Sequence, residues 1–218
     1  MRTRVKICGI TRVEDGVAAA RAGCDAIGLV FWPGTPRVVG AGRAREIEAG
    51  LPPFVSVVGL FVDPEPGHVR ATLAAVPLDF LQFHGQEPPE FCRAFGRPYL
   101  KAITVAAGAD TAGLLEFAGR YRDAAGLLFD AAPAAGMPGG TGRTFDWGVL
   151  PTGLARPVVL SGGLTAANVA EAVRRVRPWA VDVSSGVEAE GADGRPQKGI
   201  KDPARIAAFI GEVRHADG

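Results

Sequence analysis

Cysteine is scarce in this sequence, and its positions exclude the chemistry that pairs of cysteines usually serve. The 218 residues include three, Cys8, Cys24 and Cys92, and none belongs to a CxxC motif. An odd, scattered set argues against a disulfide framework and against a zinc site built on cysteine. A chain of this length can bury most of its apolar surface, so it needs neither of them to fold. This cysteine usage fits a reducing compartment, and we expect a cytoplasmic protein.

Long apolar runs and blocks of like charge are also missing. The longest apolar run, FVSVVGLFV, is far shorter than the roughly 20 residues that a helix needs to cross a bilayer. Charge returns at Lys6, so the N-terminal segment lacks the apolar core of a signal peptide. The net charge is +1 without a basic run, which argues against nucleic-acid binding. We therefore expect no membrane and no nucleic-acid partner. Because the sequence shows no ligand cluster and no nucleotide fingerprint, we also expect no metal and no organic cofactor.

The sequence is rich, by contrast, in short β-type runs that alternate with helical patterns. The runs begin roughly 20 to 30 residues apart, about the length of a βαβ unit. They are RVKIC, AIGLVF, VSVVGLFV, FLQFH, YLKAITV, GLLFD, PVVLSG and AVDVSS. Between them, residues 165–176 and 203–213 place apolar side chains at helical spacing, and Thr11 and Thr165 are the expected N-caps of two of the helices.

Nearly continuous apolar strands that alternate with amphipathic helices predict a parallel sheet covered by helices. Eight such units in a chain of this length fit a (β/α)8 barrel, and we predict a single-domain (β/α)8 TIM barrel over residues 1–218. A doubly wound open sheet is the structural alternative. It is disfavoured because no GxGxxG motif follows the first run and because eight units exceed its usual number.

Polar residues follow the ends of most of these runs, where a barrel of this type carries its active site. Each could simply satisfy backbone groups, and a free cysteine such as Cys8 is often only a small buried hydrophobe. Their combination is more informative, since it offers a base or nucleophile, a carboxylic acid and a fork-shaped cation. The residues in question are Cys8, Arg37, Asp63, His84, Thr104, Asp130 and Asp182.

Two loops rich in glycine and serine follow the seventh and eighth runs. Gly162 and Gly163 stand before an expected helix, and Ser184, Ser185 and Gly186 stand before an expected helical turn. Free N–H groups at helix starts attract anions, and these two loops hold phosphate in many barrels. Ordinary glycine-rich turns are the alternative. We favour a phosphate site, and hence a phosphorylated small-molecule substrate.

A series of motifs that runs in order from Lys6 to Asp202 resembles the phosphoribosylanthranilate isomerase family of tryptophan biosynthesis. The motifs are KICGIT, GTPR, LQFHG, GGTGRTFDW, SGGLTAANV, and DVSSGVE followed by KD. The resemblance implies an Amadori rearrangement of N-(5-phosphoribosyl)anthranilate to 1-(2-carboxyphenylamino)-1-deoxyribulose 5-phosphate. It also implies Cys8 as general base, Asp130 as general acid, Arg37 as the group that holds the anthranilate carboxylate, and phosphate on the two loops.

This sequence departs from the family pattern at three places. Thr35 stands where the family has serine, and Phe83 stands where it has leucine. Both changes are mild. Residues 188–200 form a longer segment than the family's usual spacing, which puts only the local loop after the eighth strand in doubt. A monomer and a homodimer would use the same motifs, so both remain open.

The proposed chemistry places demands on the side chains. Asp130 must be partly protonated near neutral pH, so burial would have to raise its pKa above the usual value of about 3.9. A Cys8 thiolate suits proton abstraction if the helix N-termini at the barrel mouth lower its pKa below about 8.5. Arg37 can grip a carboxylate with two parallel hydrogen bonds, which lysine could not do.

Two of the remaining candidates have alternative roles. His84 either lines the site or is structural, and Asp182 either contacts substrate or orients the eighth loop. The glycine-rich residues 136–144 are typical of a mobile lid. Cys24 and Cys92 are expected to be packing residues.

Two other functions fit parts of the same pattern. The related phosphoribosyl-amine isomerase of histidine biosynthesis has a similar fold and chemistry, but it carries an aspartate where this chain has Cys8. A barrel that binds phosphosugars without turning them over is the second, because fold does not determine function. The presence of both Cys8 and Asp130 argues against it.

Overall fold

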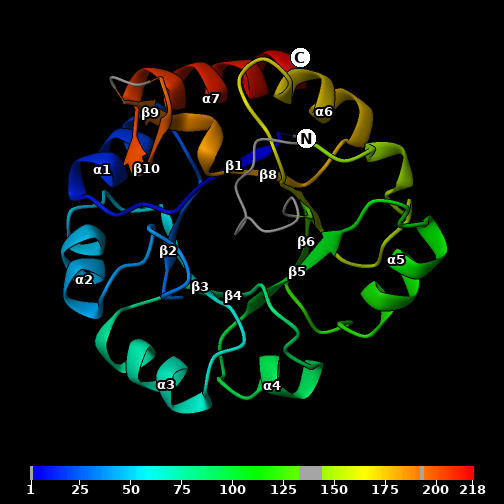
Figure 1. Ribbon diagram of the computed structural model, residues 1–218, viewed down its shortest axis with the longest axis horizontal. Coiled ribbons are helices and arrows are strands. Elements are labelled where there is room, and N and C mark those ends of the chain that lie inside the picture. The colour runs from blue at the N-terminus through cyan, green and yellow to red at the C-terminus, as the bar shows by residue number, and fades with distance from the viewer. Residues whose placement is uncertain (1, 133–143, 192–193) are drawn as a thin grey trace.

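The eight runs predicted as strands form eight parallel strands that pair in chain order and close into a barrel (Figure 1). The computed structural model describes residues 2–132, 144–191 and 194–218. Closure is made by β1 and β8, with Val5 opposite Val181, which rules out the open sheet. The strands are β1 (Arg4–Cys8), β2 (Ala26–Val30), β3 (Ser56–Phe61), β4 (Phe80–Phe83), β5 (Tyr99–Val105), β6 (Gly126–Ala131), β7 (Val158–Leu160) and β8 (Ala180–Val183).

Helices surround the barrel and cover its outer face (Figure 1). The apolar outer side chains of the strands pack against the helices in one continuous core. The helices are α1 (Val13–Ala22), α2 (Ala41–Ala49), α3 (Pro66–Ala75), α4 (Pro89–Arg93), α5 (Thr111–Gly119), α6 (Val169–Val176) and α7 (Pro203–Asp217), with the short 3-10 helices η1 (Trp147–Val149) and η2 (Ser185–Val187). Among the described residues, none of these helices has the length and apolar character needed to cross a membrane.

Two of the predicted N-cap residues do not cap their helices. Asp202 caps α7 as its type predicts, because its carboxylate accepts from the backbone N–H of Ala204 at 2.8 Å. Thr11 does not cap α1, since its hydroxyl donates to the carbonyl of Gly199 at 2.6 Å. Thr165 does not cap α6, which begins at Val169 after a turn closed by the Asn168 side chain. Tertiary contacts and a local turn override the simple cap pattern at both places.

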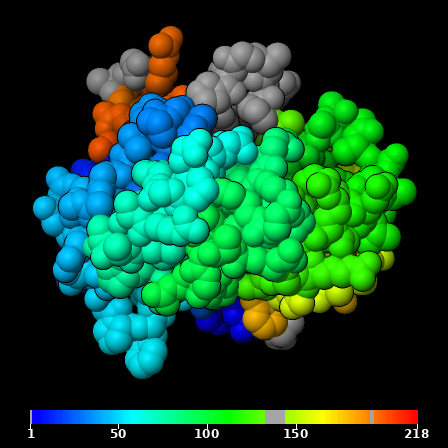
Figure 2. Space-filling model, turned by 90° about the horizontal axis from the view of Figure 1, so that it is seen from below, coloured from blue at the N-terminus to red at the C-terminus, as the bar shows by residue number. Residues whose placement is uncertain are grey.

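The extended segment after β8 folds into a hairpin of its own. Strands β9 (Glu188–Glu190) and β10 (Pro196–Lys201) pair antiparallel and form a two-stranded sheet separate from the barrel. Figure 2 shows part of this hairpin in orange, rising from one end of the molecule. The segment that the family spacing left in doubt therefore contains two paired strands, and the eight-stranded barrel closes without them.

Small apolar side chains close the inside of the barrel beneath its C-terminal end. Each of them lies two residues before a residue that lines the pocket described below, and period-two alternation puts both on the same face of the strand. This cluster, the barrel floor, consists of Ala102 (β5), Leu128 (β6), Val159 (β7) and Ala180 (β8). On β1 the corresponding position is held by the buried cation Lys6.

Candidate active site

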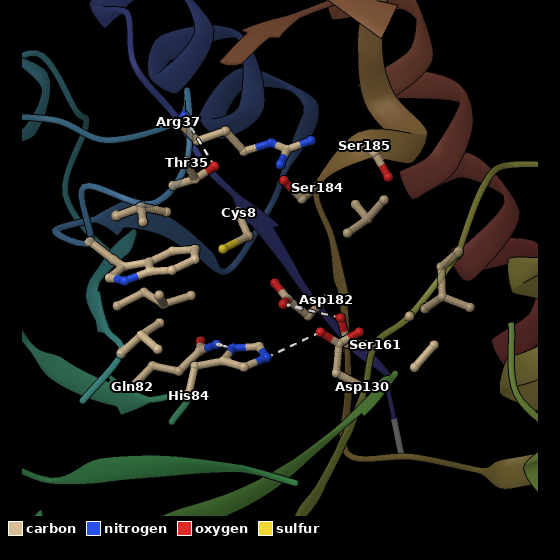
Figure 3. Close-up of a pocket in the computed structure, with 18 of the residues that line it drawn as sticks. Cys8, Thr35, Arg37, Gln82, His84, Asp130, Ser161, Asp182, Ser184 and Ser185 are labelled. Atoms are coloured by element: carbon tan, nitrogen blue, oxygen red, sulfur yellow. Dashed lines mark hydrogen bonds and ion pairs between the residues drawn. The ribbon is translucent and has the colours of Figure 1, made fainter. Parts of the chain in front are cut away.

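A pocket of about 320 Å³ opens at the C-terminal ends of the strands. This volume is at the lower end of the range typical of small-molecule sites. The pocket collects predicted residues from far apart in the sequence: Cys8, Arg37, His84, Thr104, Asp130, Gly162, Gly163, Asp182, Ser184 and Ser185 all line it (Figure 3). Asp63 does not line it, because its carboxylate instead accepts from the backbone N–H of Gln86 at 2.6 Å.

Cys8 is the last residue of β1, and its thiol faces this pocket (Figure 3). It is 6% exposed and packs against Val30 and Leu60. Burial raises the pKa of the Cys8 thiol above its ordinary value, and the nearby Lys6 ammonium opposes that rise only in part. The Cys8 pKa therefore does not fall below its ordinary value, which was the condition for a ready thiolate base, because desolvation is the largest effect.

Asp130, near the end of β6, carries the second predicted catalytic group. Its Oδ2 lies 3.1 Å from His84 Nε2, and His84 Nδ1 lies 3.1 Å from Gln82 Nε2. When the Gln82 amide donates to Nδ1, the ring hydrogen lies on Nε2 and points at the Asp130 carboxylate. His84 is thus a pocket residue in direct contact with Asp130, the first of the two alternatives left open for it.

Asp182, on β8, is almost fully buried at the bottom of the pocket. Its Oδ1 accepts from Lys6 Nζ at 2.8 Å, and Ser161 Oγ donates to its Oδ2 at 3.4 Å. These contacts run to β1 and to the end of β7. The Asp182 carboxylate is therefore held as half of a buried ion pair at the pocket floor.

Arg37 reaches the pocket from the loop after β2, but two nitrogens of its guanidinium group are already bound to Glu188. Its Nε and Nη2 donate to the two carboxylate oxygens of Glu188 at 2.7 and 2.9 Å. Glu188 also accepts from the backbone N–H of Gly199 at 2.8 Å and from Lys201 Nζ at 3.3 Å. Burial opposes ionisation of Glu188, but the hydrogen bonds from Arg37 and the charge of Lys201 outweigh it and lower its pKa. We call Arg37, Glu188 and Lys201 the hairpin clasp.

The two predicted phosphate loops lie side by side at the rim of the pocket. Gly162 and Gly163 both have positive φ, and a Cβ on Gly162 would lie 2.4 Å from the backbone nitrogen of Ala131. Gly186 packs against the other loop, where a Cβ would lie 2.0 Å from the carbonyl oxygen of Leu164. Gly186 is not among the residues that line the pocket, so its part is to let the loops approach each other.

One part of the phosphate prediction needs correction. Gly162 and Gly163 were expected to stand directly before a helix, but α6 begins only at Val169. The glycines therefore belong to an intervening turn, in which the Asn168 side chain donates to the carbonyl of Gly163 at 3.0 Å. Any anion affinity of this loop comes from local backbone N–H groups at positive-φ glycines.

Comparison with known proteins agrees with this geometry. The family described as N-(5'phosphoribosyl)anthranilate (PRA) isomerase matches residues 5–212. The chain belongs to the phosphoribosylanthranilate isomerase family. A curated N-(5'-phosphoribosyl)anthranilate isomerase of Alcanivorax borkumensis is 56% identical over 97% of this chain and 95% of its own length. One of Pseudomonas syringae pv. syringae is 55% identical over 96% and 97%.

Solved structures of phosphoribosylanthranilate isomerases share the fold over the whole chain. The Thermotoga maritima enzyme has a TM-score of 0.83 at 39% identity and covers 98% of this chain and 99% of its own. A second structure, with a TM-score of 0.79 at 37% identity and the same coverage, is a complex with reduced 1-(o-carboxyphenylamino)-1-deoxyribulose 5-phosphate. These neighbours support the barrel assignment independently of the motifs.

Several polar residues in and around the pocket were not singled out from the sequence. Lys6 belongs to the KICGIT motif and Glu188 to the DVSSGVE motif, but the motifs predicted no role for either residue. Gln82 is fully buried, and its Oε1 accepts no hydrogen bond from the described residues. A lysine in a strand of otherwise buried residues was the available signal for Lys6, because buried lysines are rare unless they are paired.

The remaining predictions concern the proposed lid and the other two cysteines. The proposed lid, residues 136–144, lies outside the described residues except at its last position. Cys24 and Cys92 are buried in the core outside the pocket, as expected of packing residues. Burial raises the pKa of each to about 12, so neither thiol is reactive at neutral pH.

Proposed function

We propose that this chain isomerises N-(5'-phosphoribosyl)anthranilate to 1-(2-carboxyphenylamino)-1-deoxyribulose 5-phosphate in tryptophan biosynthesis, with Cys8 as base and Asp130 as acid. One observation carries the proposal: the Cys8 thiol and the Asp130 carboxylate enter a single pocket from different sides of the barrel (Figure 3). The activity named for the relatives and the product analogue bound in one of them support it. We expect the reaction to take place in the cytoplasm.

The acid acts first in this mechanism. Protonation of the ribose ring oxygen by Asp130 lets the bond from that oxygen to C1 break, while the anilino nitrogen forms a double bond to C1. His84 Nε2 lies 3.1 Å from the Asp130 carboxylate and is placed to orient it and to exchange a proton with it. A positioned acid of this kind typically contributes about 10² to 10⁴-fold in rate.

The base acts on the substrate after its ribose ring has opened. Cys8 removes the proton from C2, the electron pair of that bond forms the C1–C2 double bond, and the electrons of the C1–N double bond return to nitrogen. The resulting enol becomes the ketone by moving a proton from its oxygen to C1. Each proton that a side chain gives or takes is returned, so the net change is an isomerisation.

The pocket also offers binding groups for each end of such a substrate. An apolar wall that includes Trp32, Leu60 and Val62 suits an aromatic ring. Arg37, whose Nη1 takes no part in the clasp among the described residues, is the cation that would hold the anthranilate carboxylate. Ser184, Ser185 and the glycines of the neighbouring loop would hold the phosphate.

The decisive experiment follows anthranilate-type fluorescence as purified protein meets freshly made phosphoribosylanthranilate. Rapid loss of signal with wild type and little with Cys8→Ser or Asp130→Asn is the expected result. Equal turnover by Cys8→Ser would place the base elsewhere. A parallel assay with the phosphoribosyl amine of histidine biosynthesis measures whether the pocket discriminates. Tight binding without turnover would reject the isomerase in favour of a binding protein.

A further inference from the structure

Lys6 is a buried cation that the mechanism above does not use. It occupies the middle of β1 with its side chain 5% exposed, beside the barrel floor. Placing an ammonium group in such surroundings is costly unless it is paired, and Asp182 supplies a partner at 2.8 Å. Burial by itself would lower the pKa of Lys6, but the charges of Asp182 and Cys8 raise it overall, so Lys6 stays protonated at neutral pH.

Lys6 and Cys8 lie on the same face of β1, because they are two residues apart in a strand. Gly28 of β2 stands directly opposite Cys8 in the barrel register. A Cβ on Gly28 would lie 2.7 Å from Cys8 Sγ and 3.1 Å from Lys6 Nζ. The thiol and the ammonium therefore flank one point on the barrel wall, and the absence of a side chain at Gly28 leaves them next to each other.

We propose that Lys6 is a positioning residue that stabilises the thiolate of Cys8 from beneath, so that Cys8 can serve as the base. The inference rests on the proposed function for its catalytic meaning. When Cys8 loses its proton, the new negative charge appears beside a fixed ammonium at a largely buried position, where such an interaction is stronger than in water. This addresses the difficulty that burial creates for a thiol base.

Other charged groups around the pocket set the background for this effect. Asp182 raises the pKa of the Cys8 thiol and Lys201 lowers it, each less than burial does. Lys201 and Arg37 are both engaged by Glu188, which leaves Lys6 as the cation with the larger effect on the thiol. The charged or titratable pocket groups on the other elements are Arg37 after β2, His84 after β4, Asp130 on β6, Asp182 on β8 and Lys198 on β10.

The test measures the alkylation of Cys8 by iodoacetamide as a function of pH, without substrate. Cys24→Ala and Cys92→Ala in every protein leave Cys8 as the sole thiol. Lys6→Met should move the midpoint of the rate profile up by a unit or more. At pH 7 the rate should fall about threefold to tenfold, because one pKa unit is tenfold in thiolate and higher basicity offsets part of this.

Three further variants separate positioning from simple charge balance. Asp182→Asn leaves Lys6 in place and should move the midpoint down. If Lys6 served only to neutralise Asp182, removing both charges in Lys6→Met/Asp182→Asn would return the midpoint to the wild-type value, which would overturn the proposal. Direct stabilisation of the thiolate by Lys6 leaves the midpoint of that double variant above wild type. Gly28→Ala changes no charge but forces the thiol and the ammonium apart, so it should raise the midpoint as Lys6→Met does.

A matched control removes another buried ion pair in the same barrel. Lys101 on β5 and Glu87 are paired at 2.7 Å and are as buried as Lys6 and Asp182. Lys101→Met combined with Glu87→Gln should leave the Cys8 profile unchanged. A Lys6→Met profile that coincides with wild type would overturn the proposal. If the midpoints shift as expected while wild type turns over no phosphoribosylanthranilate, Lys6 keeps its part and the isomerase assignment fails.

Discussion

Replacing Glu188 with glutamine tests whether the hairpin clasp holds Arg37 ready for substrate. The Glu188 side chain is fully buried and accepts from Arg37 twice, from Lys201 and from the backbone of Gly199. Removing its charge leaves two buried cations without their counterion. Breaking a buried pair in this way costs about 3 to 5 kcal/mol of folding free energy. We therefore expect Glu188→Gln to lower the free energy of unfolding by roughly that amount.

The same substitution should affect substrate binding more than turnover. Arg37 would lose one of the two hydrogen bonds that fix its orientation, because glutamine has a single acceptor oxygen, and it would also lose its counterion. KM should therefore rise at least about tenfold, while kcat should fall less because Cys8 and Asp130 are untouched. Urea denaturation and steady-state kinetics measure the two effects. Glu190→Gln, on the same strand, is the matched control: its exposed pair with Arg205 should contribute less than about 1 kcal/mol.

The clasp also predicts how stability depends on pH. The pKa of Glu188 is lower in the folded protein than its ordinary value of 4.5. Ionised Glu188 therefore stabilises the fold above that ordinary value, and this contribution is lost as the pH falls through the folded pKa. Wild type should lose unfolding free energy below about pH 4, and Glu188→Gln should lose less. Equal stability of the two proteins at neutral pH would refute the clasp.

Three further substitutions probe the pocket. Asp130→Asn should reduce kcat by about 10² to 10⁴-fold with little change in KM, measured by fluorescence; an unchanged kcat would contradict the acid assignment. Arg37→Lys should raise KM at least about tenfold, because a lysine ammonium cannot bind both oxygens of Glu188 and still present a further nitrogen to the substrate, and a wild-type KM would argue against it. Gly162→Ala should weaken the binding of inorganic phosphate and destabilise the fold by about 1 to 3 kcal/mol, since its Cβ would lie 2.4 Å from the Ala131 nitrogen. Calorimetry measures the binding and denaturation measures the stability. Unchanged values would contradict the loop assignment.

The barrel could be predicted from the sequence because its signals are local and repeated. Each strand is a short apolar run, and the interval between runs is the length of a βαβ unit. The starts of α1 and α6 could not be predicted. The start of α1 depends on a contact with a residue far away in the sequence, and the start of α6 depends on a turn closed by the Asn168 side chain. Thr11 bonds to Gly199, which no local pattern can reveal.

The candidate site was predictable to the extent that barrel topology collects strand ends in one place. Cys8, His84 and Asp130 were found in this way, and they share the pocket. The partners of these residues were harder to find. Glu188 lies 151 residues from Arg37, and Lys6 meets Asp182 only because β1 and β8 close the barrel. The pKa of Cys8 depends on burial, which the sequence alone does not quantify.

The hairpin formed by β9 and β10 has a consequence for how this enzyme can be altered. Both ends of the hairpin are fixed by the clasp, Glu188 at the start of β9 and Lys201 at the end of β10. Residues 191, 194 and 195, the described part of the segment between the two strands, do not line the pocket. The length of this segment can therefore vary without moving Arg37, and the segment is a suitable place to insert an epitope or a fluorescent label that reports on the barrel mouth.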